Sequence, residues 1–291
     1  MDARVEYEPR ARQVTLAGRG GAMAVLDFGP PDRPVDVVFS HANGFNARTY
    51  RSILAPLAGS LRILAVDMRG HGASTLPAEV ETRGGWNDFR DDLLAFLDAE
   101  ADGPVVLAGH SMGGTSSLLA AAQAPARVRA LALFDPVIFP LGVARDTMGD
   151  NPLADGAQRR RAVFPSKAAV VEAYTGRGAF RTWRAEQLAD YVEAGFRETE
   201  AGEVTLTCAP AWEASNFRTH NYDPWAAFRA TRCPIRILRA EIGSTARLDE
   251  GLSELEATGR VRVDLIPETS HFLPMERPDL VREALAAVAA G

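Results

Sequence analysis

Short apolar runs alternate with amphipathic segments along most of this chain, and that alternation restricts the fold more than any other feature. The runs are rich in β-branched residues and carry apolar side chains in succession, which is typical of parallel strands covered on both faces. They lie at residues 35–39, 62–67, 104–109, 130–135 and 235–240. The segments between them place apolar residues at helical spacing, at 47–59, 86–100 and 115–124. We therefore predict an α/β fold with a mostly parallel central sheet and helices on both faces.

The two ends of the chain extend this pattern. Three runs near the N-terminus, at 4–9, 13–18 and 22–29, are broken by turns and predict an antiparallel edge. Near the C-terminus, a predicted strand at 261–271 is followed by a final helix that Pro278 introduces.

The regular recurrence of predicted strands stops after Asp135. From about residue 140 to 222 no buried strand is evident, and the pattern predicts helices at 155–164, 166–176 and 181–196. We therefore predict a helical insertion. The expected organisation is a first part of the core at 1–138, the insertion at 139–224 and a second part of the core at 225–291.

Composition excludes several classes of function. The 291 residues carry a net charge of −6 without a concentrated basic stripe, so we expect no nucleic-acid partner. No run is long and apolar enough to span a bilayer, and the charged N-terminus lacks a signal-peptide pattern. The cysteines, Cys208 and Cys233, do not form a CxxC motif, which favours a reduced, cytoplasmic protein. No cofactor or metal fingerprint is present, so we expect neither. The oligomeric state is left open.

The segment GHSMGG at residues 109–114 is the clearest chemical signal. It matches G-x-S-x-G, in which a sharp turn between a strand and a helix exposes a serine at the apex. The predicted strand before it and the predicted helix after it supply that context. Gly109 and Gly113 would allow the close backbone approach, so Ser111 is the candidate nucleophile.

A serine nucleophile needs a base within hydrogen-bond reach, and His271 is the best placed of the five histidines. It follows the last predicted strand and precedes the last helix, at the sheet edge where Ser111 should emerge. His110 should point away from Ser111 across the turn. We interpret His71 and His220 as structural or pocket-lining residues.

Four motifs in this order resemble the α/β-hydrolase fold family. They are HANGF at 41–45, DMRGHGAS at 67–74, GHSMGG at 109–114 and SHFLPMERP at 270–278. The resemblance covers nearly the whole predicted sheet domain. It implies that the insertion is a variable cap that shapes the substrate pocket, and that DMRGHGAS braces the catalytic loops.

The resemblance also implies the type of chemistry. Family members with an aspartate at the apex attack alkyl carbons, whereas Ser111 implies attack on a carbonyl through an acyl-enzyme. The backbone N–H of Met112, directly after the nucleophile, should donate to the oxyanion. The second donor should be Asn43 in the segment His41-Ala42-Asn43, where Ala42 replaces the family's usual glycine.

The acid that orients His271 has two candidates. Most family members carry it after the strand that here spans 235–240, where Glu241 is the only nearby acid. A subset that resembles pancreatic-type lipases places it at the end of the preceding strand, where Asp135 lies. We place Asp135 ahead of Glu241 and keep both open.

These observations predict a serine hydrolase of the esterase or lipase type that cleaves a small or medium-sized apolar carboxylic ester. The expected partner is a small-molecule ester substrate. An acyltransferase or a thioesterase would use the same residues, and a non-catalytic ligand-binding protein could share the fold.

Overall fold

The computed structural model describes residues 8–141, 151–219 and 221–291. Its centre is an eight-stranded sheet in the order β1-β2-β4-β3-β5-β6-β10-β11. The strands are β1 (Arg10–Leu16), β2 (Gly21–Phe28), β3 (Val37–Ser40), β4 (Ile63–Val66), β5 (Val105–His110), β6 (Val128–Phe134), β10 (Ile235–Ile242) and β11 (Val261–Ser270). β2 pairs antiparallel with both β1 and β4, and the strands β4, β3, β5, β6, β10 and β11 run parallel to one another. The predicted α/β class with a mostly parallel sheet is confirmed.

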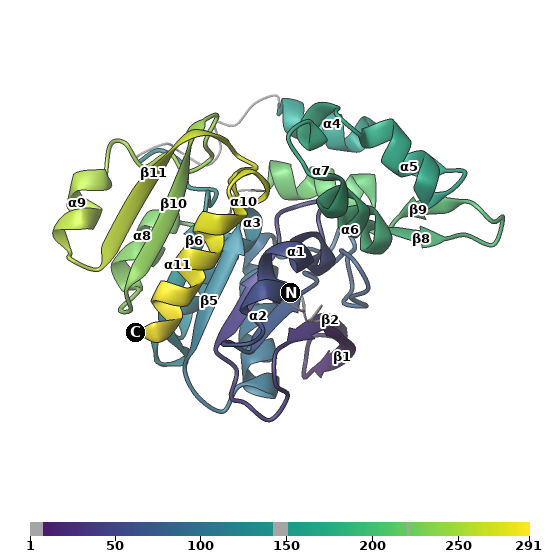
Figure 1. Cartoon of the computed structure of the whole chain (residues 1–291). Helices are drawn as coiled ribbons and strands as arrows, with labels where there is room; N and C mark the ends of the chain where they lie inside the picture. The colour runs from purple at the N-terminus through teal and green to yellow at the C-terminus, as the bar shows by residue number, and fades with distance from the viewer. Residues whose placement is uncertain (1–7, 142–150, 220) are drawn as a thin grey trace, which may run out of the picture.

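Helices cover both faces of the sheet (Figure 1). One face carries α2 (Trp86–Glu100), α3 (Met112–Gln123), α8 (Pro224–Ala230) and α9 (Leu252–Ala257). The other carries η1 (Ala47–Tyr50), α1 (Arg51–Leu54), η2 (Ala55–Leu57), α10 (Leu273–Glu276) and α11 (Pro278–Ala290). Neighbouring strand residues join different cores: Val38 packs with the first group, and Val37 and Phe39 pack with the second. This explains the continuous apolar runs, because alternate side chains point to opposite, equally buried faces.

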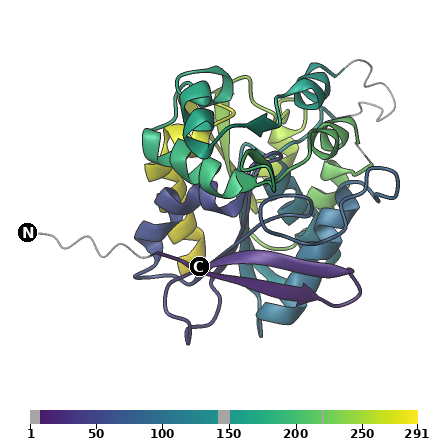
Figure 2. The same cartoon turned by 90° about the vertical axis from the view of Figure 1, so that its right-hand side faces the viewer.

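The edge formed by β1 and β2 lies far from β11 and is visible as a two-stranded ribbon in Figure 2. The strand predicted at 4–9 lies almost entirely outside the described residues. In the described part of the chain, no helix combines the length and the apolar character needed to cross a membrane.

Between β6 and α8 the chain leaves the sheet and forms a separate group of elements above its carboxyl edge (Figure 1). We call this group the insertion. It contains α4 (Pro152–Arg159), β7 (Val163–Phe164), α5 (Lys167–Tyr174), η5 (Gly178–Phe180), α6 (Ala185–Gly195), β8 (Phe196–Glu198), β9 (Val204–Leu206) and α7 (Pro210–Arg218). Asn151 and Ser166 cap the first turns of α4 and α5 with their side chains.

The insertion differs from its predicted, purely helical form. β7, β9 and β8 make a small antiparallel sheet, and the helix predicted at 155–164 ends at Arg159 so that Val163 and Phe164 can pair with β9. Phe164 and Phe196 lie on the two outer strands of this sheet, which both pair with β9, and their rings are buried against each other.

Candidate active site

Ser111 lies at the turn between β5 and α3, with φ 54° and ψ −119°. This left-handed conformation is strained for a residue with a side chain and is typical of a nucleophile at such a turn. Glycine is required around it. A Cβ on Gly113 would lie 2.2 Å from the Ser40 carbonyl oxygen, and one on Gly109 would lie 2.5 Å from the Gly113 carbonyl carbon. The two glycines therefore let the start of α3 press against β3 and β5.

His271, directly after β11, meets Ser111 across 160 residues of sequence. The Ser111 hydroxyl donates to His271 Nε2 at 3.0 Å. On the other side of the ring, His271 Nδ1 donates to Asp135 Oδ2 at 2.7 Å. The structure thus brings three of the predicted residues into one line: Ser111, His271 and Asp135.

Asp135 follows β6 and is completely buried, with φ 42°. Besides His271, its carboxylate accepts from the Ala240 N–H at 3.0 Å, from the Ser244 hydroxyl at 2.5 Å and from the Thr245 N–H at 3.0 Å. Burial raises the pKa of this carboxyl, but the bonds from His271, Ser244 and Ala240 outweigh burial, and the net pKa lies below its ordinary value. The site is therefore built to hold a carboxylate anion.

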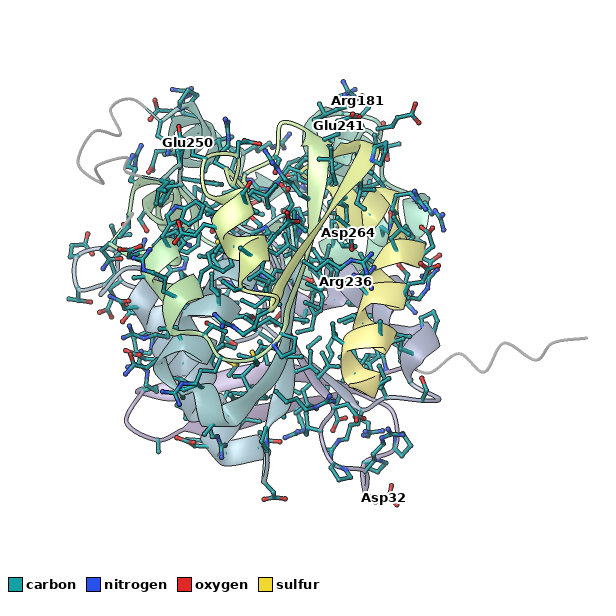
Figure 3. The ribbon with its side chains drawn as sticks, turned by 90° about the vertical axis from the view of Figure 1, so that its left-hand side faces the viewer. Asp32, Arg181, Arg236, Glu241, Glu250 and Asp264 are labelled. Carbon is teal, nitrogen blue, oxygen red and sulfur yellow. The ribbon has the colours of Figure 1, made fainter. Side chains whose placement is uncertain are left out.

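Glu241 lies elsewhere. It is exposed near the end of β10 (Figure 3), where its carboxylate accepts from the Glu268 N–H at 2.9 Å. Glu268 has φ 59°, so this bond supports a left-handed residue at the irregular part of β11. The structure does not bring Glu241 to His271.

The two predicted oxyanion donors have free backbone groups. In the described part of the chain, neither the Met112 N–H nor the Asn43 N–H donates to another protein group. Met112 is the first residue of α3, whose unpaired N–H groups and dipole favour negative charge. The Asn43 side chain is held by α7: its Nδ2 donates to the Glu213 carbonyl at 3.0 Å, and its Oδ1 accepts from Asn216 at 2.8 Å.

The other motif histidines connect the loops around Ser111. His71 Nε2 accepts from the Gly44 N–H at 3.0 Å, and His41 Nε2 accepts from the Met68 N–H at 2.9 Å. Burial lowers the pKa of His71 to about 4 and that of His41 well below its usual range. Both rings are therefore neutral acceptors at neutral pH.

His110 points away from Ser111, toward the backbone of His271. Its Nε2 donates to the His271 carbonyl at 2.7 Å, and its Nδ1 accepts from the Tyr50 hydroxyl at 2.7 Å. The same hydroxyl accepts from the Ala42 N–H at 3.2 Å. This buried chain of hydrogen bonds joins the Asn43 loop to the His271 loop, and strand position alone did not predict it. His220 lies outside the described residues.

Comparisons with known proteins agree with this architecture. A sequence profile of the Alpha/beta hydrolase family matches residues 37–284. The chain therefore belongs to the α/β hydrolase family, and the predicted resemblance is confirmed.

Among its relatives is 2-(acetamidomethylene)succinate hydrolase of Mesorhizobium japonicum, 28% identical over 253 residues that cover 86% of each chain. A crystal structure of E-2-(acetamidomethylene)succinate hydrolase superimposes with a TM-score of 0.80 at 26% identity, covering 97% of this chain and 100% of that one. Over a shorter stretch of 125 residues, 2-hydroxymuconate semialdehyde hydrolase of a Pseudomonas species is 35% identical, which covers 41% of this chain and 43% of the relative. These similarities support hydrolysis as the class of reaction.

Proposed function

We propose that this protein is a serine hydrolase that cleaves a carboxylic ester of a small molecule through an acyl-enzyme. The observation that carries the proposal is the line of hydrogen bonds from the Ser111 hydroxyl through His271 to Asp135, at 3.0 and 2.7 Å. Such a line lets the imidazole take the serine proton while the carboxylate stabilises the resulting imidazolium.

The steps follow from the geometry. His271 Nε2 takes the Ser111 proton as Oγ attacks the substrate carbonyl. The tetrahedral oxyanion then accepts from the Met112 and Asn43 N–H groups, each worth about 3 kcal/mol of transition-state stabilisation. His271 gives the proton to the leaving oxygen, and the alcohol departs. A water molecule, deprotonated by His271, then attacks the acyl-serine. As the second tetrahedral species collapses, His271 returns that proton to Ser111 Oγ and the acid is released.

The hydrogen bond to His271 supports Asp135, rather than Glu241, as the acid of this machinery. The hydrogen bonds of the Asn43 side chain to Glu213 and Asn216 of α7 support a role for the insertion as a cap over the site. The boundaries proposed for this cap are residues 139–224.

A second candidate is hydrolysis of an amide. The relative from Mesorhizobium japonicum is named for an acetamido derivative of succinate, and attack on an acetamide carbonyl would use the same type of acyl-enzyme and the same oxyanion donors. The two candidates differ in the leaving group, an alcohol or an amine, which His271 must protonate.

Turnover of a panel of p-nitrophenyl esters and matched acetanilides tests the proposal. We expect hydrolysis that Ser111→Ala lowers by at least about 10³-fold. Ser117→Ala is the matched control, since this buried hydroxyl of α3 donates to the Gly113 carbonyl at 2.8 Å and to the Ala108 carbonyl at 3.5 Å, and not to Ser111 or His271. Equal rates in wild type and Ser111→Ala would contradict the proposal.

A further inference from the structure

Arg83, on the loop before α2, carries a positive charge that the surrounding protein leaves largely uncompensated. Its Nη1 donates to the Ser215 hydroxyl of α7, and its guanidinium lies 4.7 Å from the centre of the Trp212 ring. Its Nε and Nη2 are shielded from solvent, and neither has a hydrogen-bond partner among the residues that the structure describes. Burial lowers the pKa of Arg83 to about 10, against the opposing influence of Asp88.

The two unpartnered nitrogens form one edge of the guanidinium, with parallel N–H groups that match the two oxygens of a carboxylate. This protein uses the same edge elsewhere. Arg69 donates from Nε and Nη2 to Asp92 at 2.8 and 2.7 Å, and Arg62 donates likewise to Asp27 at 3.3 and 3.0 Å. In Arg83 this edge meets no carboxylate of the described part of the chain.

Arg83 differs in this respect from the other arginines of residues 8–141, 151–219 and 221–291. Four of them also contain a buried nitrogen without a hydrogen-bond partner, but in each it is Nε alone: Arg48, Arg127, Arg239 and Arg260. A buried, unpaired two-donor edge costs free energy that a bound anion would recover.

A cavity of about 510 Å³ adjoins this residue, between the loop at 80–85 and α7. Its volume falls within the range of small-molecule sites. Arg218 and Glu81 also line it, but Arg218 pairs with Asp155 at 3.0 Å. A smaller cavity of about 200 Å³ is lined by Arg83 and Trp212. Ser111 and His271 line neither cavity.

We propose that the larger cavity binds a small molecule bearing a carboxylate group, separately from the Ser111 site, with Arg83 as the anchor. The free edge is closed to solvent, so Arg83 must swing toward the cavity to meet the ligand. This movement would exchange the hydrogen bond of Arg83 to Ser215 for bonds to the ligand. A single negative charge fits better than a phosphate dianion, because Arg218 is already neutralised and Glu81 lines the same wall.

Calorimetric titration of the Ser111→Ala protein with butyrate in chloride-free buffer tests the site without any dependence on catalysis. We expect saturable binding that Arg83→Met weakens by about ten-fold or more. Arg236→Met is the matched control. Arg236 pairs with Asp264 at 3.0 Å on the far strands of the sheet (Figure 3), and its loss should leave the affinity unchanged.

Arg83→Lys keeps the charge but removes the two-donor edge, so it should weaken binding several-fold even where Arg83→Met fails to fold. Three results would overturn the proposal: no saturable binding to the folded protein, an affinity that neither Arg83 variant changes, or Arg83-dependent binding of inorganic phosphate without binding of butyrate. If butyrate binds in the Ser111 pocket instead, neither Arg83 variant will change its affinity, which is the second of these results.

Discussion

At the scale of single residues, the arrangement around Asp135 explains why a carboxylate can stay charged where no water reaches it. Three residues other than His271 donate to its two oxygens: Ala240, Ser244 and Thr245. An amide in its place could accept some of these bonds, but it could not stabilise an imidazolium.

Asp135→Asn should therefore lower kcat by about 10³- to 10⁴-fold while leaving the fold intact, because His271 would lose its correct tautomer and its counter-charge. Glu241→Gln is the comparison, and we expect it to stay within about three-fold of wild type since Glu241 only supports the Glu268 turn. Steady-state kinetics with the best ester substrate measure both. If Glu241→Gln loses the activity and Asp135→Asn keeps it, the assignment of Asp135 as the acid is wrong.

The sequence could narrow the acid to Asp135 and Glu241 but not choose between them. The choice depends on how the loop after β10 folds back toward the end of β6, and that loop supplies Ser244 and Thr245 to Asp135 through contacts across 109 and 110 residues. Ser111 and His271 were predictable because each follows a strand with a clear local signature. Arg83 had no such signature, since its unpaired state depends on where α7 lies.

At the scale of elements, α7 connects the insertion to the predicted oxyanion loop. Asn216 and the Glu213 carbonyl hold the Asn43 side chain, and the Glu213 carboxylate lies where a side chain on Gly44 would be, 2.5 Å from its Cβ position. We therefore expect the position of α7 to determine how well the Asn43 N–H is oriented toward the oxyanion.

Asn216→Ala should lower kcat by about ten-fold with little change in KM, because a loosened donor matters most when negative charge develops. Asn87→Ala is the matched control: Asn87 lies on α2 and only accepts from Arg90 at 3.0 Å. An unchanged kcat in Asn216→Ala would show that α7 does not aim this loop.

The turn that carries Ser111 depends on glycine more strongly than on any side chain. Gly113→Ala places a Cβ 2.2 Å from the Ser40 carbonyl, so we expect a loss of about 3 kcal/mol or more in the free energy of unfolding, or no folded protein. Gly103→Ala has open space around the new Cβ and should lie within about 1 kcal/mol of wild type. Urea denaturation followed by circular dichroism distinguishes the two outcomes, and equal stabilities would refute the close packing.

Most elements of the core were predictable to within a few residues, apart from the short helices α8, α9 and α10, because the strands are buried on both faces and carry continuous apolar runs. The strands of the insertion were not, because β7, β8 and β9 have 2, 3 and 3 residues. Segments so short show no periodicity, and only their pairing with one another defines them.

At the scale of the whole molecule, buried neutral histidines make stability depend on pH. Burial lowers the pKa of His110 to about 3 and that of His71 to about 4. Their contribution to stability is complete above the unfolded pKa near 6.5 and is lost as pH falls toward the folded values. Asp67 acts in the opposite direction, since burial raises its pKa to about 6, and its contribution is lost as pH rises through that value.

The difference between wild type and His110→Gln isolates one histidine, because Asp67 and His71 act equally in both proteins. At pH 7 the variant should be less stable, since it loses the bonds to Tyr50 and to the His271 carbonyl. From pH 7 to pH 5 the difference in the free energy of unfolding between the two proteins should shrink by about 2 kcal/mol, because only wild type has to keep His110 unprotonated. A gap in the free energy of unfolding that stays constant over this range would contradict the buried neutral state.

The central claim is that Ser111 is a nucleophile activated by His271, and reaction with a fluorophosphonate followed by peptide mass spectrometry tests it most directly. We predict one adduct per chain, located on Ser111, absent from Ser111→Ala and formed much more slowly in His271→Gln. A folded wild-type protein that stays unlabelled, or that carries its adduct on another residue, would contradict the account.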